Sequence, residues 1–78
     1  MGRMNQPFTA ATTFGERMRS SRQERGWSQE RLAEECGLHW TYVSSVERGE
    51  RNVSLLNILK VADALSIDPA KLIQGLTP

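Results

Sequence analysis

Cysteine and histidine are almost absent from this sequence, which holds one of each among its 78 residues. Cys36 and His39 therefore cannot form a disulfide framework or a Cys/His zinc site within one chain. One histidine beside scattered serines also supplies no set of nucleophile, base and orienting acid. We therefore expect no enzyme, no cofactor and no metal site, and we expect Cys36 to pack as a small hydrophobic residue in a reducing compartment.

Long hydrophobic runs and a strong net charge are missing as well. Without a long apolar run there is no candidate signal peptide or membrane span, so we expect a soluble cytoplasmic protein. The formal net charge is only +1, so charge alone does not indicate a nucleic-acid partner. A chain of 78 residues forms one domain, whose core is small enough that association with a second copy would add useful stability.

Residues 27–52 contain two short helical patterns separated by a Gly-Leu turn, which is the layout of a helix-turn-helix. Ser28 is a good N-cap, because its hydroxyl can accept a hydrogen bond from a free backbone N–H of the first turn. The first helix is predicted over residues 29–36, with a narrow apolar stripe that includes Leu32. Gly37 follows at the position where a helix commonly ends in a left-handed conformation.

The second helix of the motif begins after His39, the predicted N-cap, and turns Val43 and Val46 inward. Its outward face is uncharged and consists of Trp40, Thr41, Ser44 and Ser45. Short hydroxyl groups suit base edges and phosphates, whereas a solvated helix face usually carries Lys and Glu. This face therefore indicates a DNA-recognition helix, and simple tolerance of exposure by Thr and Ser is the alternative.

The charges also favour a few well-placed contacts over loose electrostatic binding. Residues 27–53 hold three arginines and five glutamates, a balance of 3 − 5 = −2. Residues 1–26 hold five arginines and two glutamates, a balance of 5 − 2 = +3. Because residues 27–53 are net negative, they would approach DNA phosphates only through specific contacts and through the N-termini of helices.

Three further helices are predicted around this motif. Thr13 and Glu16 have the spacing of a capping box, which predicts a helix from residue 13 to Gly26 and leaves residues 1–12 as a mobile arm. A fourth helix is predicted over residues 55–65, and its apolar stripe would contain Leu55, Leu56, Ile58, Leu59, Val61, Ala62 and Leu65. We expect it to be the central core helix.

A short fifth helix is predicted after the Asp68 cap, and it carries three apolar residues, Leu72, Ile73 and Leu76. So short a helix does not have room to bury all three. Part of its face would then form a dimer surface, with core packing against the fourth helix as the alternative. The fold class predicted is all-α, a compact bundle of five helices.

Several runs in this pattern resemble the phage repressor/Cro-like (Xre) family of helix-turn-helix proteins. The runs are Ser28-Gln29-Glu30-x-Leu32-Ala33, Gly37-Leu38, Thr41-Tyr42-Val43-Ser44 and Glu47-Arg48-Gly49-Glu50-Arg51-Asn52. The chain length and the TYVSxxERGERN run are most similar to the controller proteins of restriction-modification systems. The resemblance implies a lambda repressor-like DNA-binding domain over residues 13–78 that binds double-stranded operator DNA as a homodimer. RNA polymerase is a further candidate partner.

The resemblance also assigns roles to single residues. Four residues are expected to contact the DNA backbone: Gln29, Arg48, Arg51 and Asn52. Gln29 is also expected to buttress the recognition helix. Base contacts are expected on the recognition helix from Trp40, Thr41, Ser44 and Ser45, with His39 at its start. Glu47 is expected to orient neighbouring groups, since phosphate repels a carboxylate.

Trp40 departs from the family pattern, because many controller-like sequences have arginine there. Contact with sugar or a thymine methyl, and folding back onto the protein, both stay open for Trp40. The competing function is an antitoxin or phage-type repressor, whose main partner would be a toxin protein or a prophage operator.

Overall fold

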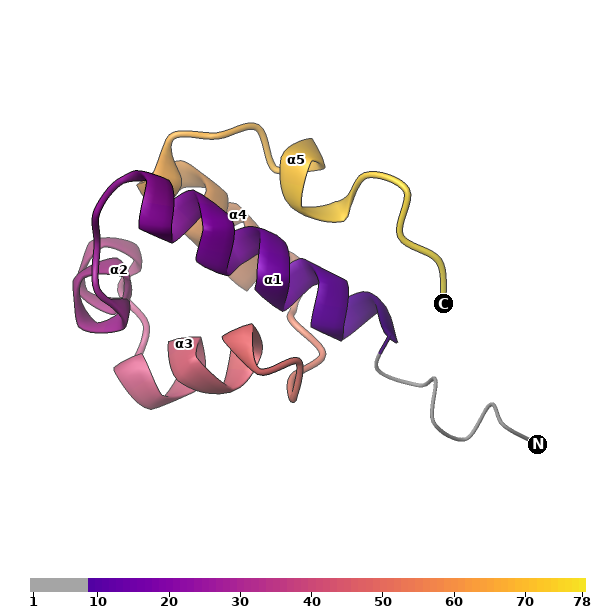
Figure 1. Ribbon diagram of the computed structural model, residues 1–78, viewed down its shortest axis with the longest axis horizontal. Helices are drawn as coiled ribbons and strands as arrows, with labels where there is room; N and C mark the ends of the chain where they lie inside the picture. Colours follow the sequence, from indigo (N-terminus) through magenta and orange to yellow (C-terminus); the bar gives the residue numbers. More distant parts are fainter. Residues whose placement is uncertain (1–8) are drawn as a thin grey trace.

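The computed structural model describes residues 9–78, which form five helices and no strand. In chain order these are α1 (Thr9–Glu24), α2 (Gln29–Cys36), α3 (Trp40–Glu47), α4 (Leu55–Leu65) and α5 (Ala70–Ile73) (Figure 1). The predicted all-α architecture of five helices is thereby confirmed. None of the helices in the described range is long and apolar enough to cross a membrane.

The first helix begins earlier than the sequence predicts. α1 starts at Thr9, so Thr13 lies inside the helix and does not cap it. The prediction of a capping box with Glu16, and of an arm extending to residue 12, is wrong. Ala10 and Ala11 favour the earlier start, because alanine has the highest helix propensity of all residues. Residues 1–8 of the predicted arm lie outside the described residues.

Local signals place the ends of α2 and α3 correctly. The Ser28 hydroxyl accepts from the Arg31 N–H at 3.0 Å, and Gly37 ends α2 in the left-handed region with φ of 71°. The Nδ1 atom of His39 accepts from the Thr41 N–H at 3.2 Å. Both N-caps and the glycine C-terminus were predicted, because each depends on contacts between near neighbours in the chain.

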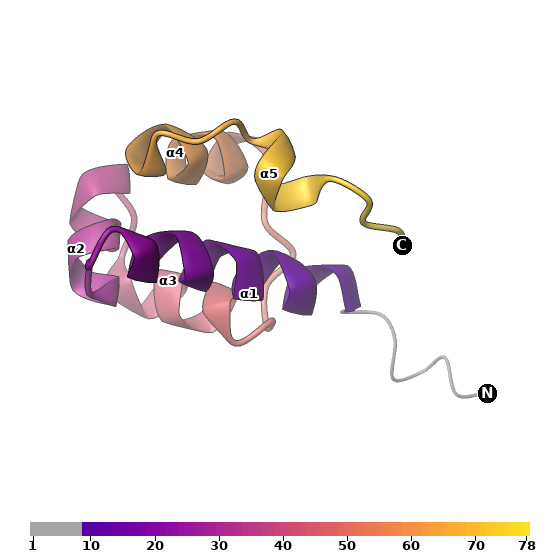
Figure 2. The same ribbon diagram turned by 45° about the horizontal axis from the view of Figure 1, so that its top comes forward.

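The core lies between two layers of helices. Figure 2 shows α4 and α5 on one side and α1 with α3 on the other, with α2 at one end. Each helix contributes at least one side chain that is almost fully excluded from solvent: Met18, Leu32, Val43, Val46, Val61, Leu65 and Leu72. Packing of α1 against α3, and of α2 against both α3 and α4, fixes the recognition helix on the body of the domain.

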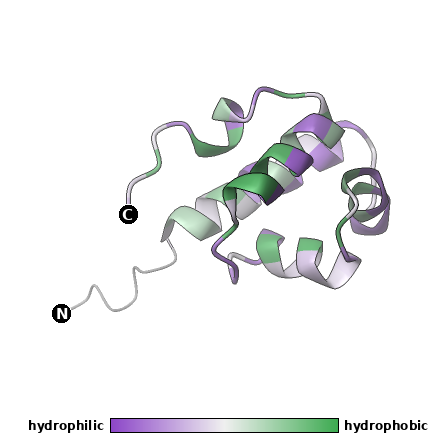
Figure 3. Ribbon diagram, turned by 180° about the vertical axis from the view of Figure 1, so that it is seen from behind, coloured by the Kyte–Doolittle hydropathy of each residue, from purple (hydrophilic) through white to green (hydrophobic). Residues whose placement is uncertain are grey.

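The apolar stripe of α4 is only partly buried. Val61, Ala62 and Leu65 reach the core as predicted. In the first two turns of α4, by contrast, three leucines lie in solvent: Leu55 is 70% exposed, Leu56 61% and Leu59 45%. The prediction that these leucines belong to the core is therefore wrong. Figure 3 shows the hydrophobic stretch on the outside of α4.

In α5 the three apolar residues do not share one role. Leu72 is fully buried, Leu76 packs half-buried against the core, and Ile73 remains 43% exposed. Arg17 holds this end of the chain against α1, because its Nη1 donates to the carbonyl oxygens of Leu72 at 3.3 Å and Gln74 at 2.8 Å. Leu72 must therefore be removed from the predicted dimer surface, which leaves Ile73 as its exposed member.

Candidate nucleic-acid interface

The exposed residues of α3 lie in the first two turns of that helix. Trp40 is 47% exposed, Thr41 is exposed, and Ser44 is partly exposed one turn further on. Val43 and Val46 fill the opposite side and are excluded from solvent. The predicted outward orientation of Trp40, Thr41 and Ser44 is therefore confirmed.

Ser45 does not belong to this face. It is only 5% exposed, and its hydroxyl donates to the Tyr42 carbonyl at 2.8 Å while accepting from Arg51 Nε at 3.0 Å. Arg51, from the segment that follows α3, covers the Ser45 hydroxyl. We therefore withdraw Ser45 from the predicted DNA contacts and assign it to holding Arg51.

His39 and Thr41 form a small polar cluster where α3 begins. Besides the backbone N–H, the Thr41 hydroxyl oxygen lies 2.7 Å from Nδ1 of His39. An Nδ1 atom that accepts from the Thr41 N–H carries no proton, so the hydroxyl is the donor in this contact. The imidazole acts as the predicted N-cap and fixes the orientation of Thr41 on the exposed face.

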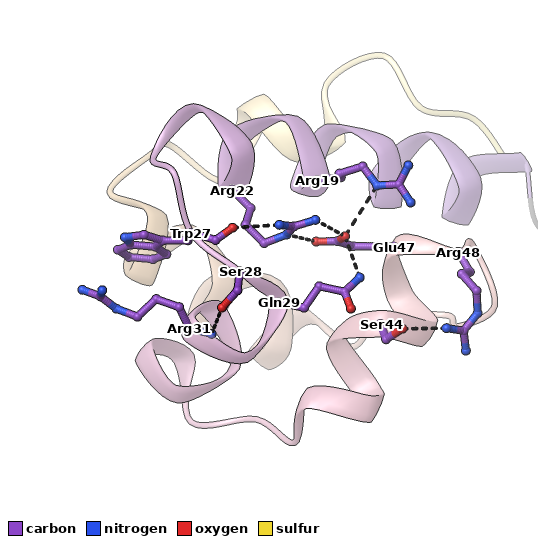
Figure 4. A network of polar contacts seen from close by, with 9 residues as sticks. All are labelled: Arg19, Arg22, Trp27, Ser28, Gln29, Arg31, Ser44, Glu47 and Arg48. Carbon is purple, nitrogen blue, oxygen red and sulfur yellow. Dashed lines mark hydrogen bonds and ion pairs between the residues drawn. The ribbon is translucent and has the colours of Figure 1, made fainter.

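A buried carboxylate ties three helices together behind α3 (Figure 4). The side chain of Glu47 is fully buried. Arg22 donates to both of its oxygens, from Nε at 2.7 Å and from Nη2 at 2.9 Å. Gln29 adds a third donor at 3.1 Å, and Arg19 Nε lies 3.6 Å from Oε1.

Burial removes water from the Glu47 carboxylate, and these donors replace the hydrogen bonds that water would have made. The hydrogen bond to Glu47 raises the pKa of Arg22, against the opposing effect of its own burial. The expected orienting role of Glu47 is confirmed, because its contacts join α1 and α2 to the end of α3. The role of Arg22 was not predicted, since it lies 25 residues away from Glu47 in the chain.

Arg51 and Asn52 follow α3 on a segment without regular secondary structure and are exposed. The Arg51 guanidinium lies 5.5 Å from the centre of the Tyr42 ring, and Asn57 Nδ2 in turn donates to the Tyr42 hydroxyl at 3.1 Å. Stacking on an aromatic ring together with the bond to Ser45 restricts the arginine to one region beside α3. A positive group held there is available to phosphate.

Arg48 occupies the last position of the same helix face. Its Nη1 donates to the Ser44 hydroxyl at 2.6 Å. Its Nε and Nη2 donate to the two carboxylate oxygens of Glu50, at 3.0 and 3.1 Å. Arg48 was predicted to lie near DNA, but its pairing with Glu50 was not predicted, because the charge of Glu50 two residues away was the only signal.

A second aromatic and cationic cluster lies at the start of α2. Arg25 and Arg31 place their guanidinium carbons 4.6 and 4.8 Å from the centre of the Trp27 ring. The Trp27 carbonyl accepts from Arg22 Nη1 at 2.8 Å. No sequence pattern predicted these contacts of Trp27 with two arginines.

Cys36 has the structural role expected of it. It is 7% exposed within the core, and burial raises the pKa of its thiol, so the uncharged form predominates there. Among residues 9–78 no group of three or more His, Cys, Asp or Glu residues is placed to hold a metal ion.

Comparison with known proteins agrees with this geometry. The profile of the helix-turn-helix family matches residues 18–72, which span α2 and α3. The chain belongs to this family, and the predicted resemblance to Xre-type regulators is confirmed. Family membership also supports a DNA-binding transcriptional regulator and not an enzyme.

Among its relatives are control proteins of restriction-modification systems. The chain is 49% identical to the control protein C.BamHI of Bacillus amyloliquefaciens over 65 residues, which cover 82% of this chain and 80% of that protein. It is 51% identical to the control protein C.SmaI of Serratia marcescens, over 81% of this chain and 77% of that protein. Its structure matches the restriction-modification controller protein C.AhdI of Aeromonas hydrophila with a TM-score of 0.81 and 52% identity, covering 83% of this chain and 98% of that one.

A weaker similarity reaches a phage regulator. The immunity repressor protein of Bacillus phage phi105 is 36% identical over 61 residues, which cover 78% of this chain but only 42% of that protein. The similarity to controller proteins is both stronger and more complete.

Proposed function

We propose that this protein is a transcriptional regulator of the restriction-modification controller type, which binds double-stranded operator DNA in the cytoplasm as a homodimer. The exposed, uncharged face of α3 carries this proposal, because Trp40, Thr41 and Ser44 lie along the side of the helix that is turned away from the core. A recognition helix enters the major groove, where hydroxyl groups reach base edges. The similarity to three controller proteins supports the same function.

The rigid support of α3 by its neighbouring helices favours base-specific recognition over non-specific DNA binding. Glu47 joins the end of α3 to Arg22 of α1 and to Gln29 of α2. A helix held on both neighbours presents its side chains in one orientation, which a base-specific contact requires. Gln29 sits in the first turn of α2, where backbone N–H groups and the helix dipole attract phosphate. We therefore assign Gln29, Arg51 and Asn52 to the DNA backbone.

The homodimer is proposed from the exposed apolar residues of α4 and α5. Leu55, Leu56 and Leu59 are exposed in the first half of α4. Ile73 is exposed on α5 and borders an open apolar groove of about 360 Å³, which Ile58 of α4 also lines. Large exposed apolar areas are rare on monomers and mark interaction sites. A second copy of the chain would cover this face and place two recognition helices about one helical turn of DNA apart, roughly 34 Å.

The antitoxin or phage-repressor alternative and the RNA polymerase partner are separate from this proposal. Similarity to the phi105 immunity repressor favours a phage-type operator as the second candidate, and no observation on this chain favours a toxin partner. RNA polymerase stays a prediction that no observation tests.

The test separates base reading from backbone contact. A preferred duplex is selected from a randomised pool with the wild-type protein, and affinity is measured over a salt series for Thr41→Ala and Arg51→Ala. Thr41→Ala should lose preference at one base pair by about 1–3 kcal/mol. Arg51→Ala should weaken binding to all duplexes alike and reduce the salt slope by about 1.

The control is Ser20→Ala, which removes a hydroxyl group from an exposed position on α1. It should bind like the wild type. If Thr41→Ala leaves every base preference unchanged, α3 is not the reading helix.

A further inference from the structure

Arg48 is held on the recognition surface more firmly than a phosphate contact requires. Thr41, Ser44 and Arg48 are spaced at i, i+3 and i+7, so they share one face of α3 and its C-terminal end. The bond from Nη1 to the Ser44 hydroxyl draws the guanidinium back along that face. Figure 4 shows the two side chains directed toward one another, away from the buried Glu47.

The position of Glu50 is fixed by the backbone that follows α3. The N–H of Gly49 donates to the Val46 carbonyl and that of Glu50 to the Ser45 carbonyl, at 2.9 and 3.0 Å. Gly49 has a φ of 78°, and a Cβ there would lie 2.7 Å from Thr12 Oγ1. Only glycine fits this turn, which packs directly on α1 and returns the Glu50 carboxylate to Arg48.

Arg48 keeps some of its N–H donors free for a further hydrogen-bond acceptor. The guanidinium has five N–H groups, and three of them are bonded to Ser44 and Glu50. Two N–H groups are left, on a planar group whose orientation three bonds define. Arginine in this state matches the paired O6 and N7 acceptors of guanine, the commonest specific contact in the major groove.

We propose that Arg48 reads a guanine base and that Glu50 is the positioning residue that orients it for this contact. The inference rests on the proposed function and replaces the backbone role expected of Arg48. Both side chains of the pair are about half exposed, so the pair adds little to folding stability. A carboxylate beside DNA also repels phosphate, so Glu50 lowers general affinity and improves selectivity through the orientation of Arg48.

The experiment compares Glu50→Ala, Arg48→Ala and the double variant with a control, Glu34→Ala. Glu34 is also exposed, and its carboxylate has no hydrogen bond or ion pair to any of residues 9–78. Its removal changes the net charge as removal of Glu50 does. Thermal unfolding first verifies that each variant is folded. Affinities are then measured for the duplex selected from a randomised pool and for duplexes with each guanine replaced in turn.

The wild type should prefer guanine at one position by about 5- to 150-fold, which corresponds to about 1–3 kcal/mol. Glu50→Ala should lose most of this preference while binding the substituted duplex at least as tightly as the wild type does. Glu34→Ala should keep the preference. In the Arg48→Ala background, removal of Glu50 should have no further effect on it.

Uniformly tighter binding by Glu50→Ala with the guanine preference intact would show that Glu50 is only a surface charge, and it would overturn the inference alone. A wild type that selects no duplex from the pool would overturn the proposed function as well.

Discussion

At the scale of single residues, the two glutamates around the end of α3 show how burial decides what an ion pair contributes. Glu47 and Glu50 each accept two hydrogen bonds from one arginine. The Glu47 side chain is fully buried, whereas that of Glu50 is 56% exposed. Removal of the buried Glu47 charge would leave Arg22 without a counter-charge inside the protein. Removal of the Glu50 charge would leave Arg48 in water, which solvates its guanidinium.

We therefore predict that Glu47→Gln lowers the free energy of unfolding by about 3 kcal/mol. Glu50→Gln is the matched control and should leave the urea midpoint close to that of the wild type. Urea denaturation at neutral pH measures both. Equal effects of the two substitutions would mean that the Glu47 network does not hold α3 in place.

The residue-level predictions that succeeded from sequence depend on near neighbours. Ser28 and His39 cap their helices through N–H groups two or three residues away. Arg22 could not be identified, because its partner lies on another helix. Ser45 was assigned to the wrong face, since the edge of the apolar side of α3 is defined by Arg51 and Tyr42, which only the folded chain brings to it.

At the scale of elements, α1 approaches α3 so closely at Gly15 that no side chain fits between the two helices. Gly15 is buried in α1, and a Cβ on it would overlap the Val46 carbonyl oxygen and lie 2.9 Å from that of Glu47. Backbone atoms cannot swing aside as side chains do. The absence of a side chain at Gly15 therefore sets the distance of the recognition helix from the body of the domain.

We predict that Gly15→Ala destabilises the protein, although alanine is the better helix former. The gain in helix propensity is about 0.8–1.0 kcal/mol, while overpacking against rigid backbone costs about 1–3 kcal/mol and displaces α3. Thermal unfolding of Gly15→Ala should show the loss. Ser20→Ala, on the exposed side of α1, should be neutral or slightly stabilising. A more stable Gly15→Ala would contradict the packing described for α1 and α3.

Helix positions were predictable wherever a cap and a stop signal coincide. The bounds of α2 and α4 agree with the sequence pattern, because serine caps precede both helices. The start of α1 was misplaced because Thr13 and Glu16 imitate a capping box inside a longer helix. Contact of Thr12 with the turn at Gly49 stabilises the extra turn of α1, and no local pattern reveals that contact.

At the scale of the whole molecule, the distribution of apolar surface distinguishes the monomer from its proposed assembly. The helical pattern of α4 correctly showed an apolar stripe, but periodicity cannot tell whether a stripe faces the core of the same chain or a second copy. Leu55 is the most exposed of these residues at 70%. Leu72, predicted for the interface, is instead a core residue, because α5 has room to bury one leucine beneath it.

We propose that two copies of the chain, joined through α4 and α5, recognise DNA with α3. Selection of duplexes from a randomised pool tests it most directly, with Leu55→Glu and the charge-matched Ser20→Glu treated in parallel. Wild type and Ser20→Glu should enrich a two-fold symmetric sequence whose half-sites lie roughly 34 Å apart, and Leu55→Glu should enrich single half-sites only. Enrichment of no sequence by the wild type, or of one unrepeated sequence by all three proteins, would contradict the account.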